Sequence, residues 1–270
     1  MRFENQVVWL TGASSGIGEA LAYEFSKQGA QLILSARRGK ELERVCAQCV
    51  GNGAATGNSA ATVPYILPLD VADLDSIPRK AEQARALFGR IDILVNNAGI
   101  SQRGLVAETE MVALQRVFQV NFFGAVAMTK AVLLEMLERR AGQIVVVSSL
   151  TGKLPLPKHA AYCASKHALQ GYFDSLRAEV ARAGVKVTVI LPGFVQSEIS
   201  ANSMDAQGLP RGQAAASRRA MRADVAARKM VQAIAQGKAE YEFGGVERFA
   251  VPLRKYAPWL YSYAIKRMKI

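Results

Sequence analysis

The sequence predicts a doubly wound α/β fold, in which one parallel sheet carries helices on both of its faces. Short apolar runs recur along the chain, and they are β-branched and nearly continuous, as expected for strands buried on both sides. Segments of helical composition lie between these runs, and this alternation is typical of a doubly wound sheet with right-handed crossovers. A chain of 270 residues is long enough for one such domain, and no convincing linker divides it.

The expected strands are six apolar runs: QVVWL at 6–10, QLILS at 31–35, VPYILPL at 63–69, IDILV at 91–95, QIVVVSS at 143–149 and VKVTVIL at 185–191. Residues 18–29 illustrate the expected helices, because they combine an apolar face with a terminal glycine. Two segments interrupt the alternation. Residues 51–62 are small and polar and predict a flexible surface loop, whereas residues 194–223 are long and poorly periodic and predict a substrate lid.

Composition narrows the function classes. Half of the residues are hydrophobic and 21% are charged, which excludes a disordered, collagen-like or coiled-coil chain. The net charge of +12 would suit nucleic acid, an anionic membrane or a phosphorylated ligand, so charge alone does not choose among them. The three cysteines are too few for a disulfide framework or a four-thiolate zinc site, and we expect a reducing, cytoplasmic location. Neither a signal peptide nor a transmembrane helix is expected.

A glycine-rich segment, TGASSGIG at 11–18, follows the first expected strand and leads directly into a helix. Gly12, Gly16 and Gly18 would let the backbone turn sharply, approach a diphosphate and pack the helix against the strand. The helix N-terminus would then present free N–H groups to the phosphates. In this strand–turn–helix context the glycines favour a dinucleotide site over a plain tight turn.

The end of the second strand distinguishes the two nicotinamide dinucleotides. An NAD site places an acid there for the ribose hydroxyls, whereas the 2′-phosphate of NADP is held by arginine. The chain reads LSARR at 34–38, with no carboxylate before Glu41, so Arg37 and Arg38 predict NADP(H). If the two arginines are merely solvated, an acid elsewhere must serve NAD.

Tyr162 and Lys166 begin an amphipathic helix after the fifth expected strand. A separation of four residues places both side chains on one helix face. A phenol needs its pKa lowered to exchange protons near neutrality, and a neighbouring ammonium can contribute to that shift. The pair therefore predicts acid–base chemistry, although YxxxK alone is common in helices.

Taken together, these motifs resemble the short-chain dehydrogenase/reductase family across residues 5–245. The resemblance rests on TGASSGIG at 11–18, Asp70 in LDVAD, NNAG at 96–99, Asn121 in VNFFG, Ser149 in VVVSS, YCASK at 162–166 and PG at 192–193. It implies a Rossmann-type, mainly seven-stranded sheet. It also implies that Tyr162 exchanges the proton, that Ser149 binds the substrate oxygen, that Lys166 binds the nicotinamide ribose and lowers the pKa of Tyr162, and that Asn121 supports a water.

The resemblance also implies which residues contact the cofactor: Gly12, Ser14, Ser15, Gly16, Ile17, Gly18, Arg37, Arg38, Asp70, Val71, Asn97, Ala98, Gly99, Tyr162, Lys166, Pro192, Gly193, Val195 and Ser197. Ser197 stands where the family has threonine, and it retains a hydroxyl for the carboxamide. Hydride transfer belongs to the nicotinamide, so the protein needs only to orient the substrate and deliver a proton, without a metal. His159 is interpreted as a neighbour of the site and His167 as a helix-surface residue.

The chain is expected to comprise a catalytic domain at 1–250 and a basic, aromatic extension at 251–270. Residues 252–270 place aromatics between basic residues, which suits peripheral contact with membrane headgroups and an apolar substrate. The alternative is a helix packed on its own domain or on a twin subunit. By resemblance to the family, a homo-oligomer, either a dimer or a tetramer, is expected.

The leading prediction is an NADP-dependent oxidoreductase that interconverts carbonyl compounds and secondary alcohols. A regulator that binds NADP without chemistry would have no need of Asn121, Ser149, Tyr162 and Lys166 together. A nucleic-acid-binding protein would explain the charge, but the sequence has no recognition motif, so no nucleic-acid partner is expected. An epimerase or dehydratase would normally need more residues.

Overall fold

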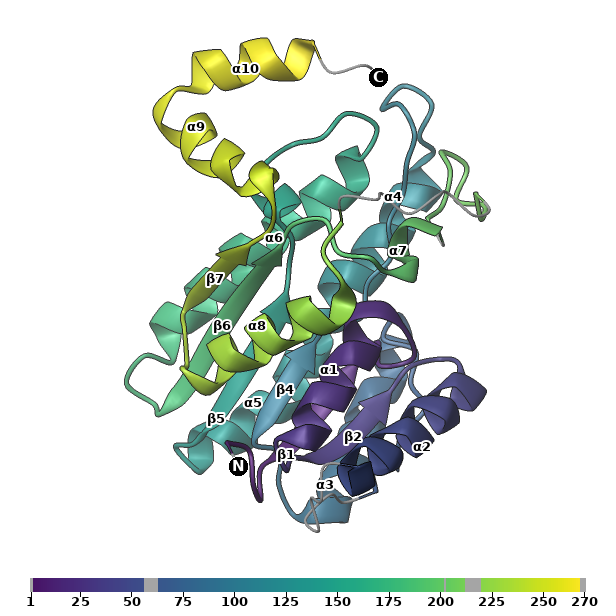
Figure 1. The fold of residues 1–270 in the computed structure, drawn as a ribbon, viewed down its shortest axis with the longest axis vertical. Helices are drawn as coiled ribbons and strands as arrows, with labels where there is room; N and C mark the ends of the chain where they lie inside the picture. The colour runs from purple at the N-terminus through teal and green to yellow at the C-terminus, as the bar shows by residue number, and fades with distance from the viewer. Residues whose placement is uncertain (1, 56–62, 202, 212–219, 268–270) are drawn as a thin grey trace.

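A computed structural model of the chain, which describes residues 2–55, 63–201, 203–211 and 220–267, has the predicted doubly wound architecture (Figure 1). Within the described residues, seven strands form one sheet in the order β3-β2-β1-β4-β5-β6-β7, and every neighbouring pair is parallel. The strands are β1 (Val7–Thr11), β2 (Gln31–Ser35), β3 (Tyr65–Ile66), β4 (Ile93–Asn96), β5 (Gly142–Val147), β6 (Val185–Pro192) and β7 (Glu240–Phe243).

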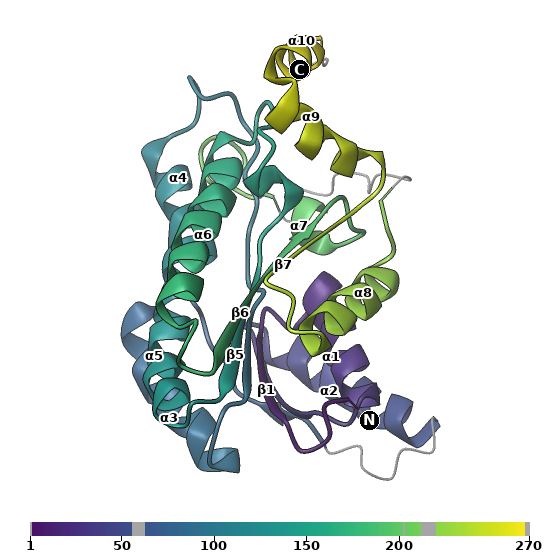
Figure 2. The ribbon, with the colours of Figure 1, turned by 90° about the vertical axis from the view of Figure 1, so that its left-hand side faces the viewer.

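Helices cover both faces of this sheet (Figure 2). One layer contains α1 (Gly16–Lys27), α2 (Gly39–Ala55) and α8 (Ala223–Ala235), and the other contains α3 (Ile77–Phe88), α4 (Met111–Phe118), α5 (Gly124–Glu138) and α6 (Ala160–Glu179). The shorter elements are α7 (Glu198–Ala201), α9 (Ala250–Tyr256) and α10 (Pro258–Lys266), the 3₁₀ turns η1 (Leu74–Ser76), η3 (Leu150–Gly152) and η4 (Val246–Phe249), and the π-helical turn η2 (Gln119–Phe123).

The central strand shows why the apolar runs are continuous. Val7 and Trp9 pack into the core beneath α3, α5 and α6, whereas Val8 and Leu10 pack into the core beneath α1, α2 and α8. All four side chains are buried, because successive residues of a strand point to opposite faces of the sheet and helices cover both faces. The sheet therefore separates two apolar cores.

The strand order reverses at β1, which pairs with β2 on one side and with β4 on the other. In open sheets of this kind, the crevice outside the carboxyl ends of the two diverging strands is the usual ligand site. Thr11 ends β1 and Asn96 ends β4, so the glycine-rich turn and the NNAG segment meet at that crevice.

Several boundaries differ from the predictions. The third strand is Tyr65–Ile66 rather than 63–69, although Leu67 and Leu69 continue the pairing to β2 through backbone hydrogen bonds of 2.9 and 3.1 Å. The loop predicted at 51–62 is wrong in its first part, because α2 continues to Ala55; residues 56–62 lie outside the described chain. The seventh strand, EYEF, has charged residues in alternation and formed no apolar run in the sequence.

The predicted lid at 194–223 contains the short helix α7 and ends where α8 begins, while residues 202 and 212–219 lie outside the described chain. Isolated bridges join Gln102 to Met204 and Val195 to Met221. The described parts of the segment are thus tied to the sheet's carboxyl edge, and the role of the segment as a lid stays a prediction.

One long apolar helix runs through α4, η2 and α5. Among the described residues, Met111–Glu138 is the single helix long and apolar enough to cross a membrane, which is weak evidence on length and composition alone. Met128, Val132 and Met136 are fully buried against the sheet. This burial is that of a core helix in a doubly wound domain.

The C-terminal extension projects from the body as α9 and α10 (Figures 1 and 2). Arg254 donates a hydrogen bond to the carbonyl of Lys153, and the Tyr261 hydroxyl donates to the carbonyl of Pro155 at 3.1 Å. Tyr256, Trp259 and Tyr263 remain exposed. The extension is therefore anchored by a few residues and presents most of its aromatic side chains to the outside.

Candidate active site

The glycine-rich turn has no room for side chains at two of its glycines. Gly12 has a φ of +67°, and a Cβ there would lie 2.8 Å from the Cα of Ala98. A Cβ at Gly18 would lie 2.0 Å from the carbonyl oxygen of Gly12. Ser14, Ser15, Gly16 and Ile17 complete the turn into α1, with Ser15 as the N-cap. The backbone is thus closely packed at the turn that was predicted to bind a diphosphate.

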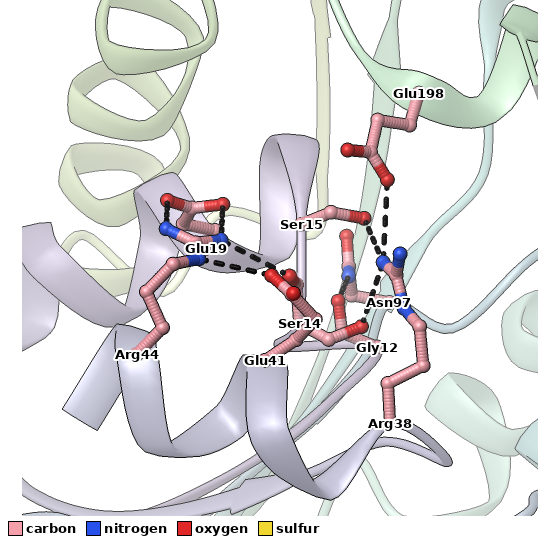
Figure 3. A network of polar contacts seen from close by, with 9 residues as sticks. All are labelled: Gly12, Ser14, Ser15, Glu19, Arg38, Glu41, Arg44, Asn97 and Glu198. Carbon is pink, nitrogen blue, oxygen red and sulfur yellow. Dashed lines mark hydrogen bonds and ion pairs between the residues drawn. The ribbon is translucent and has the colours of Figure 1, made fainter.

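Asn97 fastens this turn to the end of β4 (Figure 3). Its side-chain amide donates to the carbonyls of Thr11 at 3.0 Å and Gly12 at 3.3 Å. In return, the hydroxyl of Thr11 accepts hydrogen bonds from the N–H groups of Asn97 and Ala98. Thr11 was not predicted as a site residue. The feature of the sequence that could have identified it is its position at the end of a central strand.

Arg38 reaches across the mouth of the turn (Figure 3). Its guanidinium donates to the hydroxyls of Ser14 at 3.2 Å and Ser15 at 2.9 Å, and to the carboxylate of Glu198 at 3.2 Å. Arg37, which was predicted to share the phosphate site, is exposed like Arg38, but the contacts to Ser14, Ser15 and Glu198 found among the described residues are made by Arg38. The structure thus distinguishes two arginines that the sequence treated alike.

A second arginine beside the turn, Arg44, is already paired. It contacts Glu19 at 2.7 and 2.9 Å and Glu41 at 2.9 Å, and its hydrogen bond is the main reason why the pKa of Glu19 lies below its ordinary value. Sequence reasoning missed all three acidic and basic partners: Glu19 directly follows the motif at 11–18 without being part of it, Arg44 lies six residues beyond Arg38, and Glu198 follows Ser197 far along the chain. With Arg44 matched by two carboxylates, Arg38 is the better placed of the two for a phosphate.

Asp70 and Val71 follow β3 at the same edge of the sheet. The carboxylate of Asp70 accepts a hydrogen bond of 3.0 Å from the N–H of Ala72, which fixes the loop. Val71 is buried, and a Cβ at Gly124 would lie 2.6 Å from its carbonyl oxygen. Both residues lie in a rigid segment where the adenine was expected.

The predicted proton-transfer residues come from β5 and α6. Ser149 follows β5, and its hydroxyl accepts from the N–H of Thr151 at 3.1 Å and donates to the carbonyl of Pro192 at 3.5 Å. Tyr162 and Lys166 lie one helical turn apart on α6, with the Lys166 Nζ 5.7 Å from the centre of the Tyr162 ring. The Lys166 Nζ also donates to the carbonyl of Val147 at 2.9 Å. The end of β5 thus positions Ser149 and Lys166 together.

Asn121 lies in the π-helical turn η2, which leaves its side chain free to bond outside the helix. Its amide accepts from the N–H of Ile100 at 2.8 Å and donates to the Ile100 carbonyl at 3.0 Å and to the Ser165 hydroxyl at 3.0 Å. A Cβ at Gly99 would lie 3.3 Å from the Asn121 Oδ1 and 3.6 Å from the Lys166 Nζ. Asn121 and Lys166 therefore both lie close against Gly99, on the side where a Cβ would project.

Burial controls the ionisation of Tyr162 and Lys166. It raises the pKa of Tyr162 to about 12, against the lowering influence of a hydrogen bond with Ser149. It lowers the pKa of Lys166 to about 8, because the ammonium is removed from water. The expected lowering of the Tyr162 pKa by Lys166 is not the dominant influence within the protein, and Tyr162 is a neutral phenol near neutrality.

The segment after β6 closes the site from the other side. A Cβ at Gly16 would lie 2.9 Å from the Cβ of Ser197, so the two chain segments touch at the glycine-rich turn. A Cβ at Gly193 would lie 2.1 Å from the Oε1 of Glu247, which accepts from the N–H of Phe194. The segment that contains Pro192, Gly193, Val195 and Ser197 therefore runs from Ser149, which donates to the Pro192 carbonyl, to the glycine-rich turn, which Ser197 contacts.

The two histidines differ from one another in their surroundings. His159 is the N-cap of α6, close to Tyr162, in keeping with its interpretation as a neighbour of the site. His167, interpreted as a helix-surface residue, is partly exposed: its Nδ1 is 2.8 Å from the Cys163 carbonyl, and its Nε2 is 3.4 Å from Arg254. The second of these contacts comes from α9, to which Arg254 belongs.

These residues fit a nicotinamide dinucleotide. The glycine-rich turn at the switch point would hold the diphosphate, and Lys166 beside Gly99 would hold the nicotinamide ribose. Fold and site together define a dinucleotide-dependent oxidoreductase of the Rossmann type. The family described as short chain dehydrogenase matches residues 6–208, and the chain belongs to that family.

Curated relatives extend this likeness over the whole chain. The chain is 39% identical to a dehydrogenase/reductase SDR family protein 7-like of Drosophila melanogaster, over 100% of this chain and 83% of the relative. It is 43% identical to a protein of the same name from Anopheles gambiae, over 97% of this chain and 82% of the relative. Human dehydrogenase/reductase SDR family member 7 is 48% identical over 74% of this chain and 58% of its own length.

Solved structures share the fold. A short-chain dehydrogenase from Streptomyces avermitilis superposes with a TM-score of 0.77 at 28% identity, over 96% of each chain. A metagenomic short-chain oxidoreductase in complex with NADP superposes with a TM-score of 0.72 at 27% identity, over 91% of this chain and 100% of the other. The seven-stranded fold predicted from the resemblance is confirmed.

Proposed function

We propose that this protein is an NADP(H)-dependent reductase of carbonyl compounds with an apolar body, which it converts to secondary alcohols. The observation that carries the proposal is the meeting of Ser149, Tyr162 and Lys166 at the carboxyl end of β5, beside a glycine-rich turn that Arg38 spans. Binding chemistry and proton chemistry thus share one crevice. A regulator that binds the cofactor without catalysis would require only the residues that contact the dinucleotide.

Tyr162 would donate the proton to the substrate oxygen. A reduced nicotinamide, when bound, supplies the hydride. The phenol of Tyr162 is protonated near neutrality because burial raises its pKa, and the alkoxide that develops on the substrate is basic enough to take that proton. Ser149 would hydrogen-bond the same oxygen and hold it before Tyr162. This protonation state is the one that reduction requires.

Lys166 and Asn121 would act on the ribose side of the site. The pKa of Lys166, lowered to about 8, leaves most of the side chain charged at pH 7, and its Nζ is held by the Val147 carbonyl. The charge would stabilise the phenolate that remains on Tyr162 after the proton leaves. Asn121 lies close against Gly99, as Lys166 does, so it would support a water that returns a proton to Tyr162.

The preference for NADP(H) would depend on Arg38. Its contacts to Ser14 and Ser15 show that the guanidinium reaches the glycine-rich turn, where the 2′-phosphate of an adenine ribose would lie. The remaining predicted cofactor residues would contact the cofactor between this phosphate and Tyr162. An apolar cluster formed by Ile100, Leu114, Val117, Ala161 and Met204 adjoins the site and would contact the body of the substrate.

The proposal is tested by NADPH oxidation with a panel of ketones, aldehydes, steroids and lipid-derived carbonyls, on the wild type and on Tyr162→Phe. We expect turnover with the wild type and a loss of about a hundredfold or more in Tyr162→Phe, since the variant lacks only the proton donor. NADPH affinity, measured by fluorescence titration, should stay within about twofold. Equal turnover in the two proteins would exclude Tyr162 as the donor, and NADPH binding with no turnover on any compound would favour the regulator.

We also propose that α9 and α10 touch an anionic membrane surface. Tyr256, Trp259 and Tyr263 are exposed, and Lys255 and Arg267 lie over two of these rings. Aromatic and basic side chains in this arrangement suit the headgroup layer. Contact there would bring the site near lipophilic substrates and make the enzyme peripherally membrane-associated on the cytoplasmic side.

The chain offers a clean optical test of this contact. It has two tryptophans, and Trp9 is fully buried, so a change in emission on adding vesicles reports on Trp259. We expect a blue shift and pelleting with phosphatidylserine vesicles, neither with phosphatidylcholine vesicles, and no pelleting of Trp259→Glu. Recovery of the wild type wholly in the supernatant with both vesicles would refute the contact.

A homo-oligomer is proposed through the outer face of α4 and α5. Phe123 and Leu134 are exposed there, and a cavity of about 540 Å³ is lined by Leu114, Phe118 and Phe123. A second copy would cover this apolar surface. Light scattering should give a dimer or tetramer for the wild type and a smaller species for Phe123→Glu; a monomeric wild type would refute the assembly.

A further inference from the structure

A cationic cavity lies at the rim of the site, at the start of α6. It has a volume of about 370 Å³ and is lined by Arg103, Gly104, Leu105, Glu108, Lys158 and Arg211. This volume is in the range of small-molecule pockets. Three cations and one carboxylate line it, so its surroundings carry a surplus of positive charge that the dinucleotide site does not use.

The cavity is formed by three segments that each lead from a predicted site residue. Residues 103–108 follow the NNAG segment, Lys158 precedes Tyr162 on the approach to α6, and Arg211 lies in the segment after Ser197. Backbone hydrogen bonds join these segments: Gly104 N–H to the Lys158 carbonyl at 2.9 Å, and Arg103 N–H to the Met204 carbonyl at 2.9 Å. These backbone hydrogen bonds therefore hold the lining segments together.

Two backbone positions show how closely the lining is built. A Cβ at Gly104 would lie 2.7 Å from the Cβ of Ala206, so the loop approaches its neighbour as only glycine allows. Lys158 has a φ of +63°, a left-handed conformation that costs a lysine free energy relative to glycine. A strained residue that keeps a charged side chain at a cavity points to a use for that charge.

The cations are not matched by carboxylates of the described chain. The salt bridges found among the described residues involve other arginines and lysines. The positive potential also reaches the start of α6: burial lowers the pKa of His159, and the charges of Arg103 and Arg211 lower it further. His159 lies one helical turn before Tyr162.

We propose that this cavity binds an anionic group, a carboxylate or a phosphate, at the far end of the substrate whose carbonyl is reduced at Tyr162. The proposal rests on the proposed reductase function and narrows its substrates to amphipathic carbonyl compounds. The apolar body would lie along the cluster of Ile100, Leu114 and Met204, and Arg103, Lys158 and Arg211 would bind the charged end.

The experiment compares linear oxo-carboxylic acids of graded chain length with their methyl esters, which differ only in the charge. We expect the wild type to prefer the acid by about tenfold in kcat/KM at the length that spans the site, and the preference to shrink as salt is raised. The double variant Arg103→Gln/Lys158→Gln should lose this preference while it reduces the ester at the wild-type rate. Lys229→Gln, which removes an exposed cation on the opposite face of the sheet, is the control.

A second variant separates function from folding. Lys158→Gly removes the charge and relieves the left-handed strain, so it should raise the melting temperature while it lowers the preference for the acid. Loss of preference without loss of stability would assign the effect to the charge. Equal kcat/KM for acid and ester in the wild type, or an unchanged preference in the double variant, would overturn the proposal.

Calorimetric binding keeps this test independent of turnover. If no carbonyl compound is reduced, the proposed reductase function fails, but the wild type should still bind the acid more tightly than the ester in the presence of NADPH. The double variant should bind the two equally. Equal binding by the wild type would overturn the cavity's role whatever the activity. Phosphate-bearing ketones in the same assay distinguish the two anions.

Discussion

The guanidinium of Arg38 and the carboxylate of Glu198 lie 3.2 Å apart and join the glycine-rich turn to the first residue of α7. The contact links two segments separated by 160 residues, and Figure 3 shows the carboxylate above the same nitrogen that reaches Ser14 and Ser15. The arginine proposed to select NADP(H) thus shares its charge with the predicted lid.

Replacing Glu198 should therefore strengthen the binding of NADPH. In Glu198→Gln the guanidinium no longer faces a carboxylate that competes with a phosphate, and exposed pairs of this kind are worth about 0.2–1 kcal/mol, or up to about fivefold in affinity. Fluorescence titration with NADPH and NADH checks this, with Glu41→Gln, which removes a partner of Arg44, as the matched control. A weaker affinity for NADPH in Glu198→Gln would show that the carboxylate positions Arg38 instead.

Arg38 and Arg37 should differ in their effect on cofactor choice. Arg38→Ala removes a charged donor at the turn, so NADPH should bind about tenfold to a hundredfold more weakly, while NADH changes little. Arg37→Ala also removes a predicted phosphate contact, but the hydrogen bonds to Ser14 and Ser15 in the described structure come from Arg38, so we expect a smaller loss. Equal losses for the two nucleotides in Arg38→Ala would remove Arg38 from the phosphate site.

The two reaction directions should respond differently to pH. Reduction needs the protonated phenol of Tyr162, whose pKa is raised to about 12, and the charge of Lys166, whose pKa is lowered to about 8. Between about pH 6 and 9 the rate of reduction should therefore first stay flat and then fall as Lys166 loses its proton. Oxidation of the alcohol needs the phenolate and should rise steadily over the same range. Initial rates with NADPH and NADP measure both profiles; an oxidation rate that levels off near neutrality would mean that the bound state lowers the pKa of Tyr162.

Lys166 should make the free energy of unfolding depend on pH. Its pKa is about 8 in the folded protein and 10.5 as a free side chain, so between these values the unfolded chain binds more protons and stability rises with pH. The gain should reach up to about 3 kcal/mol by pH 10 and be lost as pH falls through 8. Urea denaturation of the wild type and of Lys166→Met compares the slopes. Because the raised pKa of Tyr162 acts in the opposite sense above pH 10, the series ends there.

The sequence predicted the layers of the fold because their signals are local. Continuous apolar runs such as VVWL locate buried strands, and the glycines of the first turn are required by contacts as close as that of Gly18 with the Gly12 carbonyl. The strand β7 was missed as a run because Glu240 and Glu242 alternate with its apolar residues, and Lys153 pairs with both glutamates. An edge strand with one polar face lacks the pattern of a buried one.

The motifs of the sequence predicted the residues of the candidate site. They did not predict the contacts that hold those residues in place. Asn97, Ser149, Tyr162 and Lys166 belong to short signatures that can be found one at a time. The bond between Arg38 and Glu198 and the contact between His167 and Arg254 of α9 depend on segments brought together only by folding. The pKa of Tyr162 is of the same kind, since desolvation is a property of the packed interior.

The π-helical turn at Gln119–Phe123 has a consequence for insertions and deletions in this chain. Such a turn contains one residue more than the α-helical turn it replaces, and each residue of a helix corresponds to a rotation of about 100°. Losing a single residue there would return the turn to α-helical geometry, so Met128, Val132 and Met136 would keep facing the sheet, whereas Asn121 would lose the position that the widened turn gives it. The extra residue therefore serves the crevice rather than the hydrophobic interior, and the two can change separately.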